Sequence, residues 1–225
     1  GLAGALSLRG TNYSDVLIAN DDNNTINLIG TELSWDNRTD ARGVDAVSAR
    51  GGDDTITWQT RGHRWSSHFS DVDNASRTYF LTGDIDGGSG KDTLVLNFWD
   101  RSWQHSWNNK WVSNSDAGDW SLDLTGFTLS GIETLNSIGN VGHATEYPSN
   151  FIFTVDQLAS LDSATGLTSV IIKGGGTVDL AHLAALNITN WEIGDDLAYT
   201  FAGTSAADTV EVGTGQTVVN AGDGN

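Results

Sequence analysis

A nine-residue pattern, kept in register over adjacent units, is the feature that most constrains the fold of this chain. Residues 87–95, GGSGKDTLV, match the template G-G-x-G-x-D-x-U-x, where U is apolar, at every fixed position. Closely spaced glycines permit a tight turn with positive φ angles, whereas Thr-Leu-Val is typical of a short strand. Each unit therefore predicts a turn, then a strand that directs one apolar side chain into a core.

The same frame recurs in other parts of the chain. Residues 10–27 read GTNYSDVLI and ANDDNNTIN, residues 40–57 read DARGVDAVS and ARGGDDTIT, and residues 203–225 read GTSAADTVE, VGTGQTVVN and AGDGN. A poorer unit occupies residues 78–86. Because an ordinary glycine-rich loop does not keep such a phase, the pattern predicts stacked turns and strands.

Composition narrows the partners that such a stack can have. The chain of 225 residues has 11 basic and 29 acidic residues, a formal net charge of -18, and no cysteine or methionine. This charge repels nucleic acid and anionic lipid and favours cations, so we expect neither nucleic-acid binding nor membrane insertion. The absence of cysteine excludes disulfides and thiolate metal sites, and the absence of methionine predicts a segment of a longer protein.

The nonapeptide resembles the RTX, or haemolysin-type calcium-binding, repeats of secreted bacterial proteins. The resemblance implies an all-β fold, a parallel β-roll or β-solenoid with calcium-binding turns and aromatic-rich loop insertions. It also implies type I secretion as an unfolded chain and folding on several Ca²⁺ ions, outside the cell or on its surface. Stacked aspartates about 4.8 Å apart repel one another without a bridging cation, so calcium binding and folding should be coupled.

The family pattern also implies positions for the calcium ligands. The strongest set is Asp92 with the carbonyls of Gly87, Ser89 and Gly90, followed by Asp54 with Gly51 and Gly52. If units alternate between the two edges of the roll, Asp54 and Asp92 lie on the same edge and share an ion. The full set of expected metal ligands is Asp15, Asp45, Gly51, Gly52, Asp53, Asp54, Asp84, Asp86, Gly87, Ser89, Gly90, Asp92, Asp208 and Asp223.

Departures from the template predict fewer ions than repeats. Asn24 and Thr217 stand where the template has aspartate, and Gly83 fills the acid position of the poor unit. Ala49 and Arg50 replace two template glycines. We expect these departures to weaken calcium binding at the units that carry them.

The remaining sequence suggests four segments. Residues 1–97 are expected to form an RTX-like roll with an insertion at 58–77, followed by a Trp-rich insertion at 98–120. Residues 121–202 are expected to continue the solenoid, with short helices at 155–161 and 180–186 that begin after threonine or aspartate. Within this segment, the stretch LSGIETLN is similar to segments of large bacterial surface proteins and adhesins. Residues 203–225 return to RTX-like repeats.

Residues 58–77 and 98–111, within these insertions, hold six of the nine tryptophans and allow three interpretations. They bury each other's indoles as a satellite core, or they form a sugar-binding platform, or His63, His68 and His105 form a metal or catalytic site. Tryptophans recur every four residues from Trp99, which on a helix makes one stripe. The expected platform residues are Trp65, Trp99, Trp103, Trp107 and Trp111.

The motifs of common enzymes do not occur in this sequence. It has no GxSxG, HExxH or P-loop motif and no cysteine nucleophile, so we expect no enzyme in this segment. The expected function is a calcium-dependent structural or adhesive module of a secreted or cell-surface bacterial protein, binding cell-surface glycans or self-associating into a layer or filament. A lectin-like module and an accessory domain of an extracellular enzyme are the alternatives.

Overall fold

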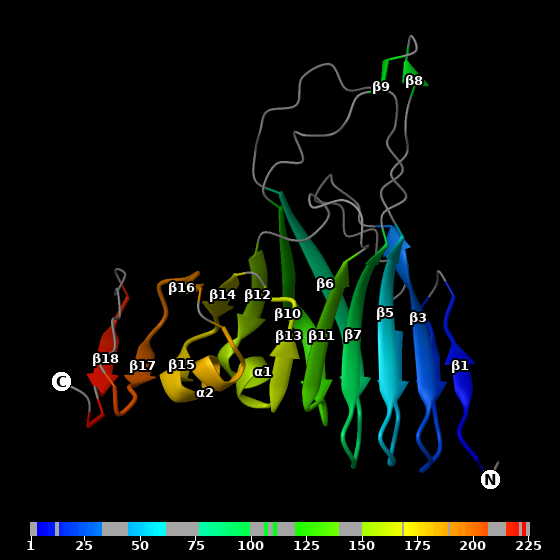
Figure 1. Ribbon diagram of the computed structural model, residues 1–225, viewed down its shortest axis with the longest axis horizontal. Helices are drawn as coiled ribbons and strands as arrows, with labels where there is room; N and C mark the ends of the chain where they lie inside the picture. Colours follow the sequence, from blue (N-terminus) through cyan, green and yellow to red (C-terminus); the bar gives the residue numbers. More distant parts are fainter. Residues whose placement is uncertain are drawn as a thin grey trace.

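The protein is a stack of coils elongated along one axis, with β1 and β18 at opposite ends (Figure 1). The computed structural model describes residues 4–11, 14–32, 45–61, 77–99, 106–107, 110–111, 120–139, 150–167, 169–188, 190–206, 215–220 and 222–223.

Two parallel sheets form the sides of the stack. The first contains β1 (Ser7–Arg9), β3 (Thr25–Glu32), β5 (Thr55–Arg61), β7 (Thr93–Trp99), β11 (Thr134–Gly139) and β13 (Ser163–Thr165). The second contains β2 (Val16–Ile18), β4 (Asp45–Ser48), β6 (Arg77–Asp86), β10 (Trp120–Ser130), β12 (Asn150–Thr154), β14 (Val170–Lys173) and β16 (Trp191–Ile193). Apart from β8 and β9, which form a separate pair, consecutive strands alternate between these sheets up to β14, and this confirms the all-β parallel roll or solenoid.

The apolar position of each repeat sets the register of the strands. Ile26 pairs with Ile56, Ile56 with Leu94 and Leu94 with Leu135, and all four side chains are fully buried. Flanking residues point outward because side chains alternate along a strand. A slip of one residue would expose the whole row, so burial holds the coils in phase.

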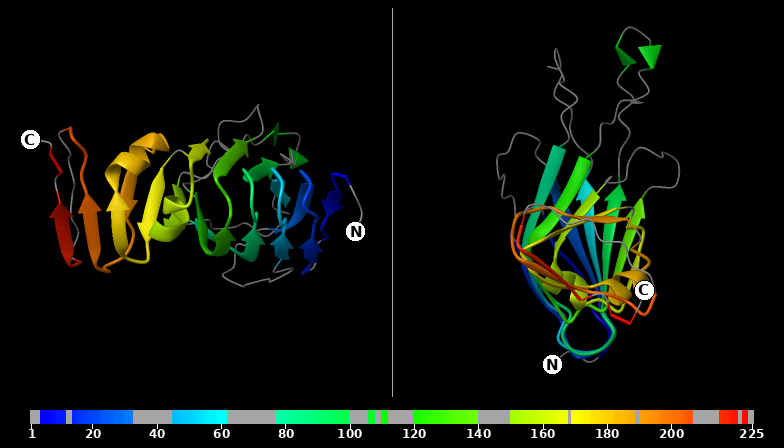
Figure 2. Two further views of the ribbon diagram at one scale, coloured as in Figure 1. Left: turned by 90° about the horizontal axis from the view of Figure 1, so that it is seen from below. Right: turned by 90° about the vertical axis from the view of Figure 1, so that its left-hand side faces the viewer.

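A third side appears in the C-terminal coils. β15 (Gly176–Asp179), β17 (Tyr199–Ala202) and β18 (Thr217–Asn220) form a third parallel sheet, and these strands lie side by side when the molecule is seen from below (Figure 2). Helix α1 (Val155–Ala159) contacts β15, and helix α2 (Leu180–Ala185) contacts β17.

Both expected helices are confirmed, and each ends slightly earlier than predicted. The side chain of Thr154 accepts a hydrogen bond from the Gln157 N–H in a capping box, and Asp179 accepts from the N–H groups of Ala181 and His182. These caps satisfy N–H groups that have no partner within a helix. The aspartate and threonine signals in the sequence therefore mark the true helix starts.

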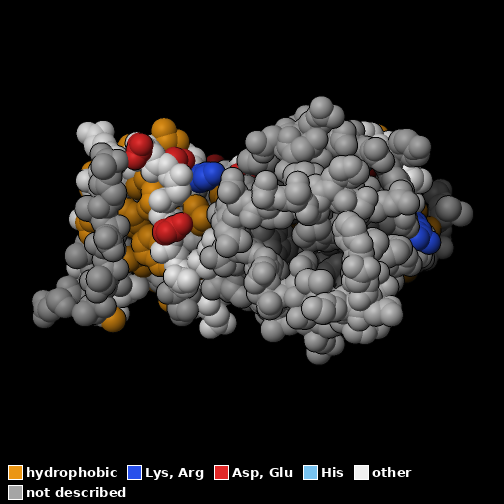
Figure 3. Space-filling model, turned by 90° about the horizontal axis from the view of Figure 1, so that it is seen from above, with side chains coloured by type: hydrophobic (Ala, Val, Ile, Leu, Met, Phe, Trp, Pro, Cys, Tyr) orange, Lys and Arg blue, Asp and Glu red, His pale blue; other side chains and the backbone are white. Residues whose placement is uncertain are grey.

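Large aromatic side chains fill the three-sided part. Phe151, Phe153 and Phe201 are among the largest fully buried side chains, and Trp191 stacks on Phe201 with 5.7 Å between ring centroids. Trp191 is only partly buried, and from above hydrophobic side chains of the C-terminal coils reach the surface (Figure 3). The core of these coils is therefore less completely covered than the row of Ile and Leu in the roll.

The structure changes two expectations for the insertions. β5 continues to Arg61, and Trp58 is 5% exposed and belongs to the core, so the boundary at residue 58 lies inside a strand. β8 (Ser106–Trp107) and β9 (Lys110–Trp111) form an antiparallel pair, so the tryptophan spacing does not follow one helix there. Among the described residues, no helix has the length and apolar character needed to cross a bilayer.

Candidate metal centre

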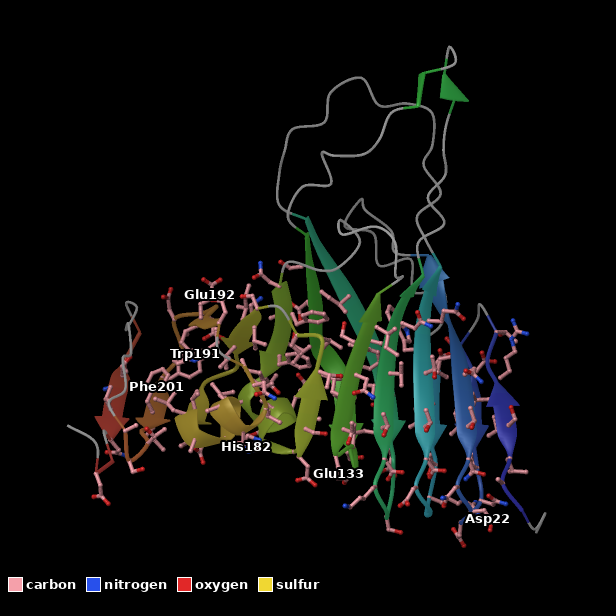
Figure 4. The ribbon with its side chains drawn as sticks, in the orientation of Figure 1. Asp22, Glu133, His182, Trp191, Glu192 and Phe201 are labelled. Carbon is pink, nitrogen blue, oxygen red and sulfur yellow. The ribbon has the colours of Figure 1, made fainter. Side chains whose placement is uncertain are left out.

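One edge of the roll collects the turns that lead into the first sheet. Residues 19–24, 49–54, 87–92 and 131–133 form these turns, and we call this side the turn edge. Asp22 and Glu133 lie along it in Figure 4, and the end-on view shows the turns as a narrow loop (Figure 2, right). The C-terminal ends of β5 and β7 lie at the opposite edge.

Neighbouring turns are stacked backbone against backbone. The N–H of Ser89 donates to the carbonyl of Arg50 at 2.8 Å. Gly88 has φ +92°, and a Cβ there would lie 1.8 Å from the same oxygen; a Cβ on Gly90 would lie 2.0 Å from the Gly52 oxygen. The template glycines therefore serve two purposes, the positive φ and the close approach of the next coil.

A column of side chains from the sixth repeat position runs along the turn edge. Asn24, Asp54, Asp92 and Glu133 each accept a backbone N–H from the preceding coil. The donors are Leu6 to Asn24 at 2.9 Å, Asn24 to Asp54 at 2.6 Å, Asp54 to Asp92 at 2.8 Å and Asp92 to Glu133 at 2.8 Å. Asp54 and Asp92 thus lie on the same edge, as expected. We call these four residues the sixth-position column.

Two oxygens of this column are buried without any hydrogen-bond partner. They are Asp54 Oδ2 and Asp92 Oδ2, on residues that are 1% and 0% exposed. A buried carboxylate oxygen without a donor is costly unless a cation or proton compensates it. The pKa of Asp92 is raised to about 6, mainly because the carboxyl is buried; the Asp54 N–H bond lowers this pKa, and the charges of Asp54, Glu133 and Asp53 contribute to raising it.

The donor set fits a hard divalent cation. Calcium prefers carboxylate and carbonyl oxygens in a flexible geometry, and the turn edge offers carboxylates beside closely stacked backbone. Within the described residues, no three carboxylate or imidazole side chains converge on one point. An ion bound here would therefore take most of its ligands from backbone carbonyls, as the family pattern implies for Gly87, Ser89 and Gly90.

A second set of acidic side chains, with two residues instead of four, lies in the turns that lead into the second sheet. The N–H of Asp15 donates to Asp45 Oδ1 at 3.0 Å, and Asp15 itself accepts from the N–H and hydroxyl of Thr11. Burial raises the pKa of Asp45, and the charge of Asp15 adds to that increase, while the Asp15 N–H bond lowers it. Asp15 and Asp45 therefore repeat the backbone-to-carboxylate hydrogen bond that links the residues of the sixth-position column.

The other expected ligands lie in different surroundings. Asp53 is on the turn edge and accepts the N–H of Lys91 at 2.9 Å. Asp84 and Asp86 lie on the exposed outer face of β6, where Asp86 accepts from the Ser130 hydroxyl at 2.8 Å, so they do not join the sixth-position column. Asp223 is exposed near the last described residues.

Several expected site residues lie outside the part of the chain that the structure describes. These are Asp208, Trp65 and Trp103, together with His63, His68 and His105. Only the backbones of Trp99, Trp107 and Trp111 are placed, all three in strands. The three interpretations of the insertions therefore stay predictions.

Glu133 is the site residue that sequence reasoning missed. With the frame placed at 128–136, Gly131 stands in the fourth position, Glu133 in the sixth and Leu135 in the eighth. The signal was Glu133-Thr134-Leu135, which repeats Asp92-Thr93-Leu94 with glutamate in place of aspartate. The absence of the first two glycines hid it.

Comparison with known proteins adds no family to this description. No protein-family model, curated protein or solved structure matches the chain. What is established is a mostly-strand protein with long all-parallel sheets, consistent with a β-roll or β-solenoid.

Proposed function

We propose that this chain is a calcium-dependent structural and adhesive module of a secreted or cell-surface bacterial protein. Its roll would order outside the cell, when calcium binds along the turn edge. The observation that carries the proposal is the pair of buried, unpartnered oxygens Asp54 Oδ2 and Asp92 Oδ2. They belong to the two strongest sets of calcium ligands that the family pattern implies.

Asp54 and Asp92 would hold the ion together with the carbonyls of the glycine-rich turns. A bound divalent cation would supply the positive charge that two adjacent buried carboxylates need. The chain's own residues set the spacing, because the Asp54 N–H already ties its coil to Asp92 at 2.8 Å. Calcium would therefore stiffen a register that the backbone and the buried Ile56 and Leu94 have set.

The adhesive part of the proposal rests on where the insertions leave the roll. β5 ends at Arg61 and β7 at Trp99, at the edge opposite the sixth-position column. Aromatic-rich segments between these strands and the next ones would be presented away from the calcium ligands. A cell-surface glycan or a neighbouring copy of the chain would bind there, and calcium would act only through the stability of the roll.

Thermal unfolding in the presence of calcium, magnesium or a chelator tests the proposal. Calcium should raise the melting temperature well above that in chelator, and magnesium should raise it less because it requires a smaller octahedral site. Asp92→Ala should remove most of the calcium effect. Asp116→Ala is the control, since Asp116 belongs to NSDAGD, outside the repeat frame.

Equal melting temperatures of the wild type in calcium and in chelator would refute the calcium assignment. If Asp92→Ala and Asp116→Ala reduced the calcium effect equally, the assignment of ligands to repeat positions would be wrong.

A further inference from the structure

Three side chains of the sixth-position column share one pose. In Asn24, Asp54 and Asp92, the Oδ1 atom accepts a backbone N–H from the preceding coil. The pairing of Thr25 with Thr55 and of Thr55 with Thr93 places the three turns in the same register. Their second side-chain atoms, Nδ2 in Asn24 and Oδ2 in the two aspartates, can therefore be compared directly.

The second atom has partners only in the asparagine. Asn24 Nδ2 donates to the carbonyl of Asn20 at 3.0 Å and to the carbonyl of Asp22. These carbonyls belong to the second and fourth positions of its own turn. The equivalent Oδ2 atoms of Asp54 and Asp92 are acceptors and have no partner.

The chemistry of the side chain explains why the turn that ends in Asn24 has its hydrogen bonds satisfied and the turns that end in Asp54 and Asp92 do not. Carbonyl oxygens and a carboxylate oxygen repel one another unless a donor or cation lies between them. An amide in the same position supplies two N–H donors and satisfies the carbonyls without a metal. Asn20 adds to this closure, since its Nδ2 donates to the carbonyl of Gly4 at 2.9 Å and to Asp22 Oδ2 at 3.1 Å.

We infer that the turn at residues 19–24 is closed by the side-chain amide of Asn24 in the place of a cation, so that this coil forms without calcium while its neighbours require it. Asn24 is thus the residue that sets where calcium binding ends along the turn edge. The N-terminal coil then provides a preformed edge, through the Asn24 N–H to Asp54 bond of 2.6 Å, on which the calcium-dependent turns assemble. The calcium part of this inference rests on the proposed function.

Exchange of amide and carboxylate at two positions tests the inference by calorimetric titration with calcium chloride. Asn24→Asp should bind one more calcium ion per chain than the wild type, and Asp54→Asn should bind one fewer. Asn23→Asp is the matched control, because Asn23 lies in the same turn but outside the column, where its Oδ1 accepts the Asp53 N–H at 2.9 Å. This control should bind the wild-type number of ions.

Thermal unfolding in chelator gives a readout that does not depend on calcium. Asn24→Asp should lower the melting temperature by at least about 4 °C, because two hydrogen bonds are lost and a buried carboxylate is added. Asp54→Asn should raise it, because the new amide can donate where Oδ2 has no partner.

The outcomes separate this inference from the proposed function. If the wild type binds calcium but Asn24→Asp binds no additional ion, the inference is overturned. It is also overturned if Asp54→Asn lowers the melting temperature in chelator. If the wild type binds no calcium, the proposed function fails, and opposite shifts of the two variants in chelator would still support closure of the first turn by the amide.

Discussion

Replacing Gly88 by alanine tests the stacking of neighbouring turns. Gly88 has φ +92°, and an added Cβ would lie 1.8 Å from the Arg50 carbonyl oxygen. An alanine held in the left-handed backbone conformation lowers the free energy of unfolding by about 1 to 2 kcal/mol. This loss is reduced by roughly 0.4 to 1 kcal/mol, because glycine loses more conformational entropy on folding than alanine does. The clash adds about 2 kcal/mol, because the coils must separate and weaken the Ser89 N–H to Arg50 bond.

Gly174→Ala is a control with nearly the same backbone angle. Gly174 has φ +93°, but the nearest atoms to an added Cβ are 3.7 Å away, on the Thr154 side chain. We therefore expect Gly88→Ala to lower the free energy of unfolding by roughly 3 kcal/mol and Gly174→Ala by roughly 1 kcal/mol. Chemical denaturation followed by tryptophan fluorescence measures both. Equal losses would refute the contact between turns as the reason for glycine at position 88.

Three further predictions concern the backbone, the column and the insertions. Arg50 has φ 73° where the template has glycine, so Arg50→Gly should raise the free energy of unfolding by about 0.5 to 1 kcal/mol; no gain in denaturation would contradict this strain. In chelator, stability should increase as the pH falls through about 6 towards 3.8, because the pKa of Asp92 is raised to about 6 in the folded state and that state then binds more protons than the unfolded one. Asp92→Asn should flatten this slope, and an unchanged slope would assign it to other groups. If the insertions form a satellite core, Trp103→Ala should lower the free energy of unfolding by about 3 to 5 kcal/mol and leave glycan-array binding unchanged. If they form a sugar platform, the same change should barely alter the free energy of unfolding and should abolish glycan-array binding.

The parts of the site that could be predicted are those that follow from the repeat itself. Counting nine residues at a time put Asp54 and Asp92 in equivalent positions, and alternation between two sheets put them on one edge. Asp84 and Asp86 are among the expected ligands, but they do not lie in a turn. They lie instead on the outer face of β6, because the apolar Ile85 between them must face the core.

The order of turns and strands along the chain was determined by the sequence alone. Glycine conformation and the alternation of side chains in a strand are local properties, so a nine-residue pattern is enough to specify them. The same holds for the starts of both helices, where Thr154 and Asp179 bond to N–H groups two or three residues away.

Only the tertiary structure decided how the turns are completed and where the two-sided roll becomes three-sided. The partners in the sixth-position column are 30, 38 and 41 residues apart in the chain, and the intervening lengths are unequal because insertions interrupt the repeats. Whether Asn24 and Glu133 join the column depends on which backbone N–H groups the preceding coil presents. Those groups are brought together by the burial of the core, so no local pattern contains them.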